Sequence, residues 1–200
     1  ATVIVKASGF QAEGIIFENS FNQYVSEKAA NDVIVPNSEC KEGSVTRGDL
    51  PAGSTAVQDK KYVERAAALA IADGCDKIFF DNCKFVGRQD TLYGGKNSTV
   101  AFYDCSIYGG CDYIFGGMTA VFAKCDLVFN TSEDGNDKGY ITAPQTPAGK
   151  HGLLMYNCHI TSTTPGVDTA SKYPSKPGDF GRPWAADSGE AVFYCSIIDA

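Results

Sequence analysis

The chain has 200 residues, a net charge of −7, and a hydrophobic fraction of 44%. This length and apolar content are enough for a sizeable core, and the negative charge argues against nucleic acid or an anionic membrane as a partner. No apolar run approaches the roughly 20 residues that a transmembrane helix needs. We therefore expect a single monomeric domain over residues 1–200.

Strand-like segments stand at both ends of the sequence. The first ten residues, ATVIVKASGF, and the last ten, AVFYCSIIDA, are rich in β-branched and aromatic residues. No initiator Met or signal-peptide pattern precedes the first of them. The sequence therefore reads as a fragment of a longer protein.

A repeated pattern then runs along the chain: an apolar or aromatic stretch, a cysteine, one residue, and an apolar residue. Successive cysteines of this pattern are 22, 20, 33 and 37 residues apart, and Ser20 takes the cysteine position in GIIFENSFN. A period of about 21 residues with insertions, in strand-forming sequence, is typical of a β-solenoid. The sequence therefore predicts an all-β fold, a right-handed parallel β-helix with one coil per repeat. The cysteines of the pattern are Cys83, Cys105, Cys125, Cys158 and Cys195.

These cysteines are expected to be buried thiols. Aligned residues on adjacent coils lie ~4.8 Å apart, and their parallel Cβ directions suit a disulfide poorly. The chain has eight cysteines but no C-x-x-C pair, and its two histidines are His151 and His159. A zinc site is therefore not expected, and neither is any other metal or cofactor.

Segments that depart from the repeat follow one another along the chain. Residues 64–72, ERAAALAIA, are strong helix formers, but they directly precede a coil in the repeat rhythm, so we predict a strand there. Polar insertions at residues 21–62, 130–138 and 161–181 are predicted to be loops, with 21–62 as a long excursion. Loops on a rigid scaffold commonly wall a cleft.

Two aspartates occupy equivalent positions of successive repeats, in FVGRQDTLYGG and IYGGCDYIFGG. Asp90 lies seven residues after Cys83, and Asp112 lies seven after Cys105, so adjacent coils should place them side by side. Two stacked carboxylates repel each other, which should raise the pKa of one of them. Such a pair can supply a proton donor and a nucleophile, although a ladder of turn-capping aspartates would explain the repeat equally well.

Other residues favour the catalytic interpretation. Gln89 precedes Asp90 and can donate an amide N–H to a developing oxyanion. The sequence GRPW at residues 181–184 supplies Arg182, which can pair with a carboxylate, and Trp184, which can support a sugar ring. An ordinary loop with an Arg–aromatic contact would also explain GRPW. Tyr113 is predicted to be a core residue.

Four stretches in this order, GRQDTLYGG, CDYIFGGMTAVFAKCDLV, GYITAPQT and GRPW, resemble the pectin methylesterases (pectinesterases) of the bacterial type, over residues 1–200. The resemblance implies a right-handed parallel β-helix that hydrolyses the C6 methyl ester of galacturonate units in pectin without a metal. It implies pectin as the partner, and a secreted or cell-surface location. It also implies that Asp112 is the nucleophile, that Asp90 is the general acid and then the base, that Gln89 stabilises the oxyanion, and that Arg182 hydrogen-bonds Asp112.

The resemblance further implies that Trp184, Phe115 and Ala143 line the sugar cleft. The family usually has a Gln at the start of a Q-A-V-A-L strand, where this sequence reads RAAAL, so Arg65 takes that place. Arg65 could bind the oxyanion or a carboxylate of the polymer, or it could simply cap the strand.

Two other functional classes are weighed against the esterase. A lyase or a glycosidase acting on pectin could share the fold, but no acidic cluster for calcium stands beside the aspartates, and the GRPW and Gln-Asp contexts fit the esterase better. A non-catalytic polysaccharide-binding β-helix would not need both aspartates. No G-x-S-x-G elbow or phosphate-binding loop supports another kind of catalysis.

Overall fold

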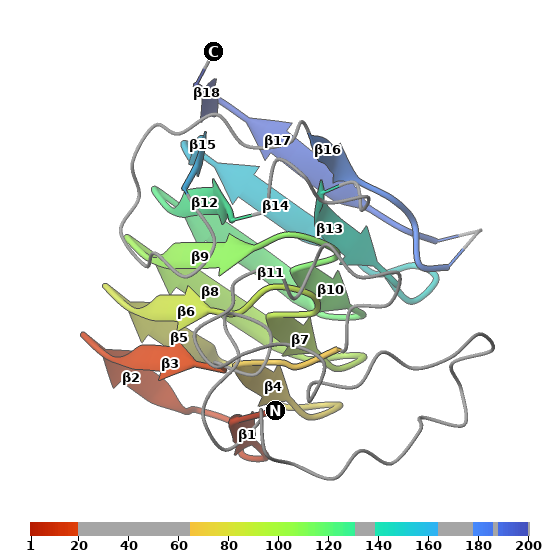
Figure 1. Ribbon diagram of the computed structural model, residues 1–200. Coiled ribbons are helices and arrows are strands. Elements are labelled where there is room, and N and C mark those ends of the chain that lie inside the picture. Colours follow the sequence, from red (N-terminus) through yellow and green to blue (C-terminus); the bar gives the residue numbers. More distant parts are fainter. Residues whose placement is uncertain (20–64, 131–138, 164–177, 186–187, 200) are drawn as a thin grey trace, which may run out of the picture.

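The computed structural model describes residues 1–19, 65–130, 139–163, 178–185 and 188–199. This part of the chain consists of 18 short strands and turns, without a helix. The strands wind in coils that ascend from the N-terminus to the C-terminus (Figure 1). Accordingly, the described residues include no helix that could cross a membrane. The all-β prediction is confirmed.

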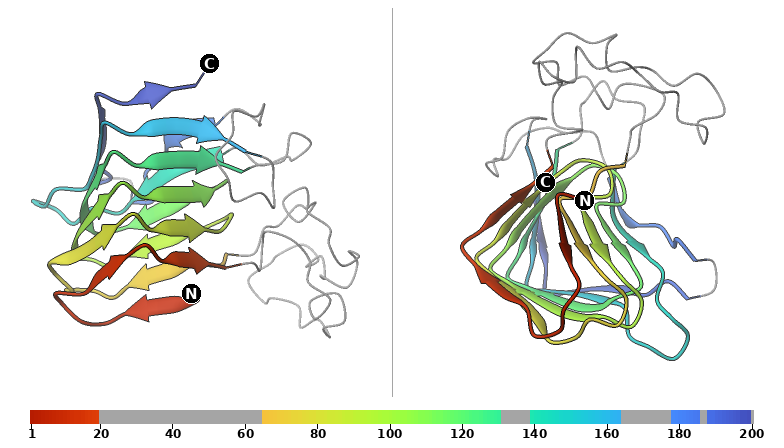
Figure 2. Two further views of the ribbon diagram at one scale, coloured as in Figure 1. Left: turned by 90° about the vertical axis from the view of Figure 1, so that its left-hand side faces the viewer. Right: turned by 90° about the horizontal axis from the view of Figure 1, so that it is seen from below.

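Each coil adds one strand to each of three parallel sheets. Sheet A contains β1 (Val3–Val5), β4 (Leu69–Ile71), β7 (Leu92–Gly94), β10 (Ile114–Gly116), β13 (Gly139–Pro144) and β16 (Gly178–Gly181). Sheet B contains β2 (Gln11–Glu13), β5 (Ile78–Asp81), β8 (Thr99–Tyr103), β11 (Thr119–Ala123), β14 (Leu153–Tyr156) and β17 (Ala191–Tyr194). Sheet C contains β3 (Ile16–Glu18), β6 (Lys84–Val86), β9 (Ser106–Gly109), β12 (Asp126–Phe129), β15 (His159–Ser162) and β18 (Ile197–Ile198). Seen along the coil axis, the sheets form a three-sided prism, a parallel β-helix as predicted (Figure 2).

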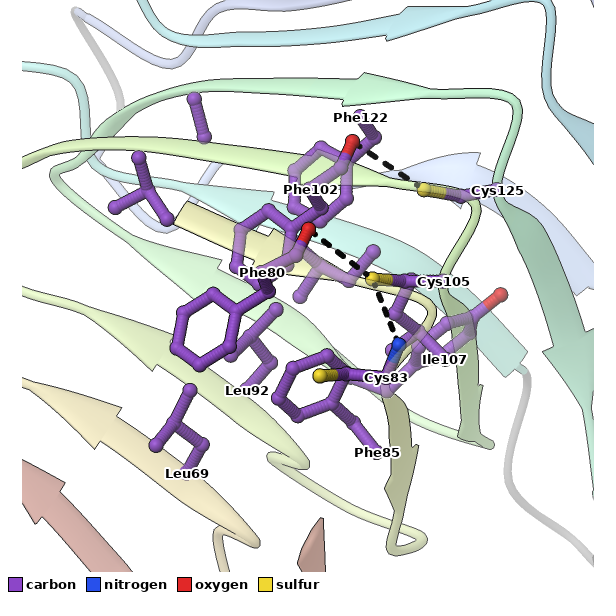
Figure 3. Close-up of a cluster of buried hydrophobic side chains, with 14 of the residues drawn as sticks. Leu69, Phe80, Cys83, Phe85, Leu92, Phe102, Cys105, Ile107, Phe122 and Cys125 are labelled. Atoms are coloured by element: carbon purple, nitrogen blue, oxygen red, sulfur yellow. Dashed lines mark hydrogen bonds between the residues drawn. The ribbon is translucent and has the colours of Figure 1, made fainter. Parts of the chain in front are cut away.

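The core consists of ladders, in which similar residues occupy aligned positions of successive coils. Phe80, Phe102 and Phe122 are aligned in sheet B and point inward, and all three are buried (Figure 3). Their rings stack nearly parallel, with centroids 5.1 Å apart for the lower pair and 4.5 Å apart for the upper pair. Offset stacked rings add attraction to the burial of their area, so the repeat stabilises itself.

The cysteine ladder lies at the corner between sheets B and C. Cys83, Cys105, Cys125 and Cys158 are buried free thiols. Figure 3 shows the first three of them on successive coils. The backbone N–H of Cys83 donates to the Cys105 sulfur at 3.4 Å, and each upper thiol reaches a carbonyl of the coil below. Burial raises the pKa of the Cys83 thiol, which favours the uncharged form. The predicted thiol state is confirmed for these four residues.

The predicted membership of Cys195 in this ladder is wrong. The pairing of β14 with β17 and of β15 with β18 aligns Cys158 with Ser196. The Cys158 N–H donates to the Ser196 hydroxyl at 3.3 Å, as the Cys83 N–H does to the next sulfur. Cys195 is exposed and has a left-handed φ of 53°, like the aligned Asn157 at 52°. The sequence continues as Ser196, Ile197 and Ile198, so an apolar residue stands two positions after both Cys195 and Ser196, and the pattern fits either residue.

The predicted ladder position of Ser20 is also wrong. Pairing of β2 with β5 and of β3 with β6 aligns Ile15 with Cys83. The Ile15 carbonyl accepts a hydrogen bond from the next coil in the same way as the Cys83 carbonyl does. Ser20 itself lies outside the described residues.

The strand predicted over residues 64–72 is shorter than expected. It comprises Leu69–Ile71, which is β4, while residues 65–68 are not in a strand, and residue 64 lies outside the described residues. The Ala68 N–H still donates to the Thr91 carbonyl at 2.8 Å, so this segment is tied to the next coil.

The predicted loops lie mostly outside the described residues. This holds for the whole of 21–62 and for 131–138, whereas Asn130 is described and buried. The loop predicted over 161–181 is wrong at both ends, because residues 161–162 belong to β15 and residues 178–181 form β16. Thr161 is paired with Val128 of β12, and its hydroxyl donates to Asp199 at 2.7 Å.

Candidate active site

The two aspartates lie side by side in the turns that lead into β7 and β10. The register of these strands, with Leu92 opposite Ile114, aligns Asp90 with Asp112 on the adjacent coil. The Asp90 N–H donates to the Cys111 carbonyl at 3.0 Å. Both aspartates have a left-handed backbone, with φ of 62° and 49°, which Asp tolerates better than most residues. The fold therefore places both aspartates side by side, just before the first residues of β7 and β10 in sheet A.

The glycine pair that follows each aspartate turn has a steric reason. Gly116 has a φ of 112°, and a Cβ there would collide with the carbonyl oxygen of Gly94 on the coil below. Glycine thus allows two coils to approach closely just after the carboxylates. Both sequence stretches therefore have Gly-Gly four residues after Asp because the coils pack closely at that point.

Arg182 binds the Asp112 carboxylate with two hydrogen bonds. Its Nε donates to Oδ1 at 2.9 Å, and its Nη2 donates to Oδ2 at 2.7 Å. The guanidinium also lies 4.4 Å from the centroid of the Tyr140 ring, and Nη2 contacts the Cys111 sulfur at 3.4 Å. The hydrogen bonds to Asp112 raise the pKa of Arg182. Asp112 is therefore held as an oriented, charge-paired carboxylate.

Asp90 is in a different environment. Its side chain is only 13% exposed, and its Oδ2 lies 3.9 Å from Nε of Arg65, too far for a hydrogen bond. Burial raises the pKa of Asp90 to about 7, with the nearby Asp112 adding to the rise and Arg65 and Arg182 opposing it. Near neutral pH, Asp90 can thus both give and accept a proton.

A cleft of about 530 Å³ opens over the pair. The aromatic rings of Phe115 and Trp184 lie at its wall with centroids 5.7 Å apart, and Trp184 is 53% exposed. Ala143, aligned with Phe115 in sheet A, leaves room beside the rings. The cleft brings together seven of the eight predicted site residues. Its lining residues are Arg65, Asp90, Asp112, Phe115, Ala143, Arg182, Pro183 and Trp184.

Gln89, the eighth predicted site residue, does not line this cleft. Its carbonyl accepts a hydrogen bond from Ala66 N–H at 3.3 Å, which ties it to the segment before β4. Its role at the oxyanion therefore stays a prediction. Tyr113 is fully buried, as predicted for a core residue.

Sequence reasoning missed two residues around Arg182. Cys111 directly precedes Asp112, and its thiol contacts the Arg182 guanidinium. The sequence contains eight cysteines and gave no reason to single out this one. Tyr140 occupies the position aligned with Asp112 on the next coil, which follows from the pairing of β10 with β13. The insertion at 131–138 conceals this alignment in the sequence.

None of the described residues form a group of three or more His, Cys, Asp or Glu that could hold a metal ion. The chemistry that this cleft can perform is that of two carboxylates and two guanidinium groups.

Comparison with known proteins agrees with the geometry of the cleft. The family model named Pectinesterase matches residues 50–200. The chain belongs to the pectinesterase family. Pectinesterase A of Dickeya chrysanthemi is 32% identical over 188 residues, which are 92% of this chain and 43% of that protein. The chain spans less than half the length of the curated pectinesterases it matches first.

Solved structures of this family share the fold. A pectin methylesterase from Yersinia enterocolitica superimposes with a TM-score of 0.68 at 29% identity, over 98% of this chain and 56% of that one. A pectin methylesterase in complex with a hexasaccharide gives a TM-score of 0.65 at 26% identity, over 96% of this chain and 52% of that one.

Proposed function

We propose that the whole protein hydrolyses the C6 methyl ester of galacturonate units in pectin, releasing methanol and pectate, with Asp112 as the nucleophile. The observation that carries this proposal is the unequal pairing of two adjacent carboxylates. Asp112 accepts two hydrogen bonds from Arg182, while burial gives Asp90 a pKa of about 7. One group is thus suited to attack and the other to proton transfer.

The first half-reaction breaks the ester. An oxygen of Asp112 attacks the ester carbonyl carbon, and the carbonyl electron pair moves to its oxygen, where the Gln89 amide is proposed to donate a hydrogen bond. Collapse of this intermediate breaks the bond to the methoxy oxygen, which takes the proton of Asp90 and leaves as methanol. An acyl-enzyme remains, with an anhydride between Asp112 and the galacturonyl group.

The second half-reaction restores the enzyme. Asp90, now a carboxylate, accepts a proton from water, and the water oxygen attacks the galacturonyl carbonyl. The anhydride bond breaks, Asp112 leaves as a carboxylate paired with Arg182, and the product carries a free C6 carboxyl group. A pKa of about 7 suits Asp90 both for donating the proton in the first step and for accepting it in the second.

The aromatic wall is proposed to bind the sugar. Trp184 and Phe115 present apolar ring faces beside the carboxylates, and Ala143 keeps the space next to them open. The hexasaccharide complex of a related pectin methylesterase supports an oligosaccharide ligand for this cleft. Because pectin is a polymer too large to enter a cell, we also propose that the protein acts outside the cell or at its surface.

Methanol release from methylated pectin by the full-length protein tests the proposal. Asp112→Asn should lower kcat by at least about 10³-fold, because an amide cannot serve as the nucleophile. Asp104→Asn is a matched control, since Asp104 has the same left-handed backbone but an exposed side chain, and it should keep full activity. Unsaturated products would indicate a lyase, and new reducing ends a glycosidase. Either result without methanol would overturn the proposal.

A further inference from the structure

The cleft contains two guanidinium groups, and they are used differently. Arg182 directs Nε and Nη2 to the Asp112 carboxylate at 2.9 Å and 2.7 Å. Arg65 is 73% exposed, and its ion pair with Asp90 has an N–O distance of 3.9 Å. The donors of Arg65 are thus open to a ligand in the cleft, whereas Nε and Nη2 of Arg182 are already engaged by Asp112.

The charge of the cleft favours an anion at Arg65. Among the residues that the structure describes, the charged ones lining the cleft are Arg65, Arg182, Asp90 and Asp112. When Asp90 carries the proton needed for the first half-reaction, two guanidinium groups face a single carboxylate. The cleft then has a net charge of about +1 on a chain whose net charge is −7.

We propose that Arg65 is a specificity-determining residue that binds a free carboxylate of a galacturonate unit next to the ester being cleaved. A guanidinium matches a carboxylate with two parallel hydrogen bonds, and such charge-assisted bonds are stronger than neutral ones. The protein would therefore prefer partly de-esterified pectin to fully methylated pectin. This inference rests on the proposed function, because it names the form of pectin that the same cleft selects.

Occupancy of Arg65 also affects Asp90. Within the described part of the chain, the charged groups that act on Asp90 are Arg65, Asp112 and Arg182, and Arg65 opposes the rise in the Asp90 pKa. A substrate carboxylate on Arg65 would offset that guanidinium charge and raise the pKa of Asp90 in the complex. The alkaline limb of kcat should then lie at higher pH on partly de-esterified pectin than on fully methylated pectin. Arg65→Gln should abolish this difference between the substrates.

A role as an oxyanion donor makes a different prediction. Removal of a donor that acts on the ester itself lowers kcat by about 10²-fold or more, on both substrates alike. Loss of a contact to a neighbouring carboxylate raises KM instead, and only where that carboxylate exists. The two roles are therefore separable by kinetics on oligogalacturonates of equal length, one fully methylated and one partly methylated.

The kinetic test compares wild type with Arg65→Gln, Arg65→Lys and Lys124→Gln. Lys124 is a matched charge control, because it is exposed on the outer side of the coil. Its Nζ donates a hydrogen bond to the Tyr103 hydroxyl at 3.0 Å. Arg65→Gln should raise KM about tenfold on the partly methylated substrate and leave KM on the fully methylated one within about twofold. Added salt should shrink the difference, and Arg65→Lys should retain part of the preference. Equal effects on both substrates, or none on either, would overturn the inference.

Binding of a fully de-esterified oligogalacturonate, measured by calorimetry, tests the carboxylate site without turnover. Arg65→Gln should weaken this binding about tenfold, while Lys124→Gln should not change it. Unchanged binding in Arg65→Gln, together with normal methanol release by wild type, would overturn the Arg65 inference alone. An absence of methanol release by wild type on every methylated substrate would overturn the proposed function, whatever the binding shows.

Discussion

The interior of the coils and the cleft above sheet A both contain identical residues at aligned positions of successive coils. This repetition stabilises the interior but destabilises the cleft. In the interior, Phe80, Phe102 and Phe122 repeat at aligned positions, and each ring stabilises its neighbours. At the cleft, Asp90 and Asp112 also repeat at aligned positions, but two like charges destabilise each other. A β-helix thus gives identical residues identical surroundings, except where another segment reaches one coil and not the next.

The segment that breaks the equivalence at the cleft is the one after β16. It places Arg182 on Asp112, while Asp90 one coil below has Arg65 at a longer distance. The repulsion between the two carboxylates is reduced in two ways, by a bidentate ion pair at Asp112 and by a pKa raised to about 7 at Asp90. The difference between the repeats is the basis of the proposed chemistry.

The largest expected effect concerns the interior ladder. Phe102 stacks on both neighbouring rings and is 1% exposed, so Phe102→Ala should lower the free energy of unfolding by about 3–5 kcal/mol. Urea unfolding measures this loss. Phe79→Ala is the matched control on the outward face of the same sheet, where Phe79 is 37% exposed, and it should cost much less. Equal losses in the two variants would mean that the stacked rings of Phe80, Phe102 and Phe122 stabilise the fold no more than an outward-facing ring does.

Replacing the bidentate partner of Asp112 should have the next largest effect. Arg182→Lys keeps the positive charge but cannot make both hydrogen bonds, so Asp112 should lose its orientation. We expect kcat for methanol release to fall about 10²-fold with little change in stability. Wild-type kcat in this variant would show that charge alone, without the paired geometry, distinguishes the two aspartates.

Removing the buried carboxyl group of Asp90 should have an effect on stability that depends on pH. Its pKa is raised to about 7 by burial, so between about pH 4 and pH 7 the folded state binds more protons than the unfolded state, and stability falls as pH rises. Asp90→Asn removes this term and should be more stable than wild type at pH 8 by roughly 2–4 kcal/mol. The attraction of Arg65 is already contained in this figure, because it opposes the rise in the Asp90 pKa. At pH 4 the two should be similar.

Thermal unfolding of both proteins at the two pH values measures the change. Asn tolerates the left-handed φ of 62° at this position, so backbone strain should not contribute. Asp104→Asn is again the control, since Asp104 has the same left-handed backbone and an exposed side chain. A gain for Asp90→Asn at pH 4 as large as at pH 8 would show that Asp90 is not the source of the pH dependence.

Much of this comparison could be predicted from the sequence, because coil repeats preserve residue type. The common offset of Asp90 and Asp112 from their cysteines was enough to align them, since no residue is inserted between the two repeats. The GRPW sequence identified Arg182 and Trp184 as site residues, although Arg182 lies 70 residues from Asp112 in the chain. Short, regular repeats fix a register without knowledge of contacts.

The rest was inaccessible for physical reasons. Cys195 was assigned to the ladder instead of Ser196 because a small residue followed by two isoleucines satisfies the pattern in two registers. Thr161 was read as a loop residue because it begins a run rich in Thr, Ser and Pro, whereas the structure pairs it with Val128 of β12. The contact of Tyr140 with Arg182 depends on alignment across the insertion at residues 131–138, which interrupts the repeat. Irregular segments remove the periodicity on which prediction depends.

The central claim, that Asp90 holds the proton of the pair, is tested most directly by the infrared absorption of protonated carboxyl groups between pH 4 and pH 9. In wild type, one carboxyl band should disappear with a midpoint at about pH 7. It should be absent from Asp90→Asn, and in Asp112→Asn its midpoint should move to lower pH, because the charge of Asp112 raises the pKa of Asp90. If every carboxyl group of the wild type has lost its proton by about pH 5, as ordinary carboxylates do, the account of the pair is contradicted.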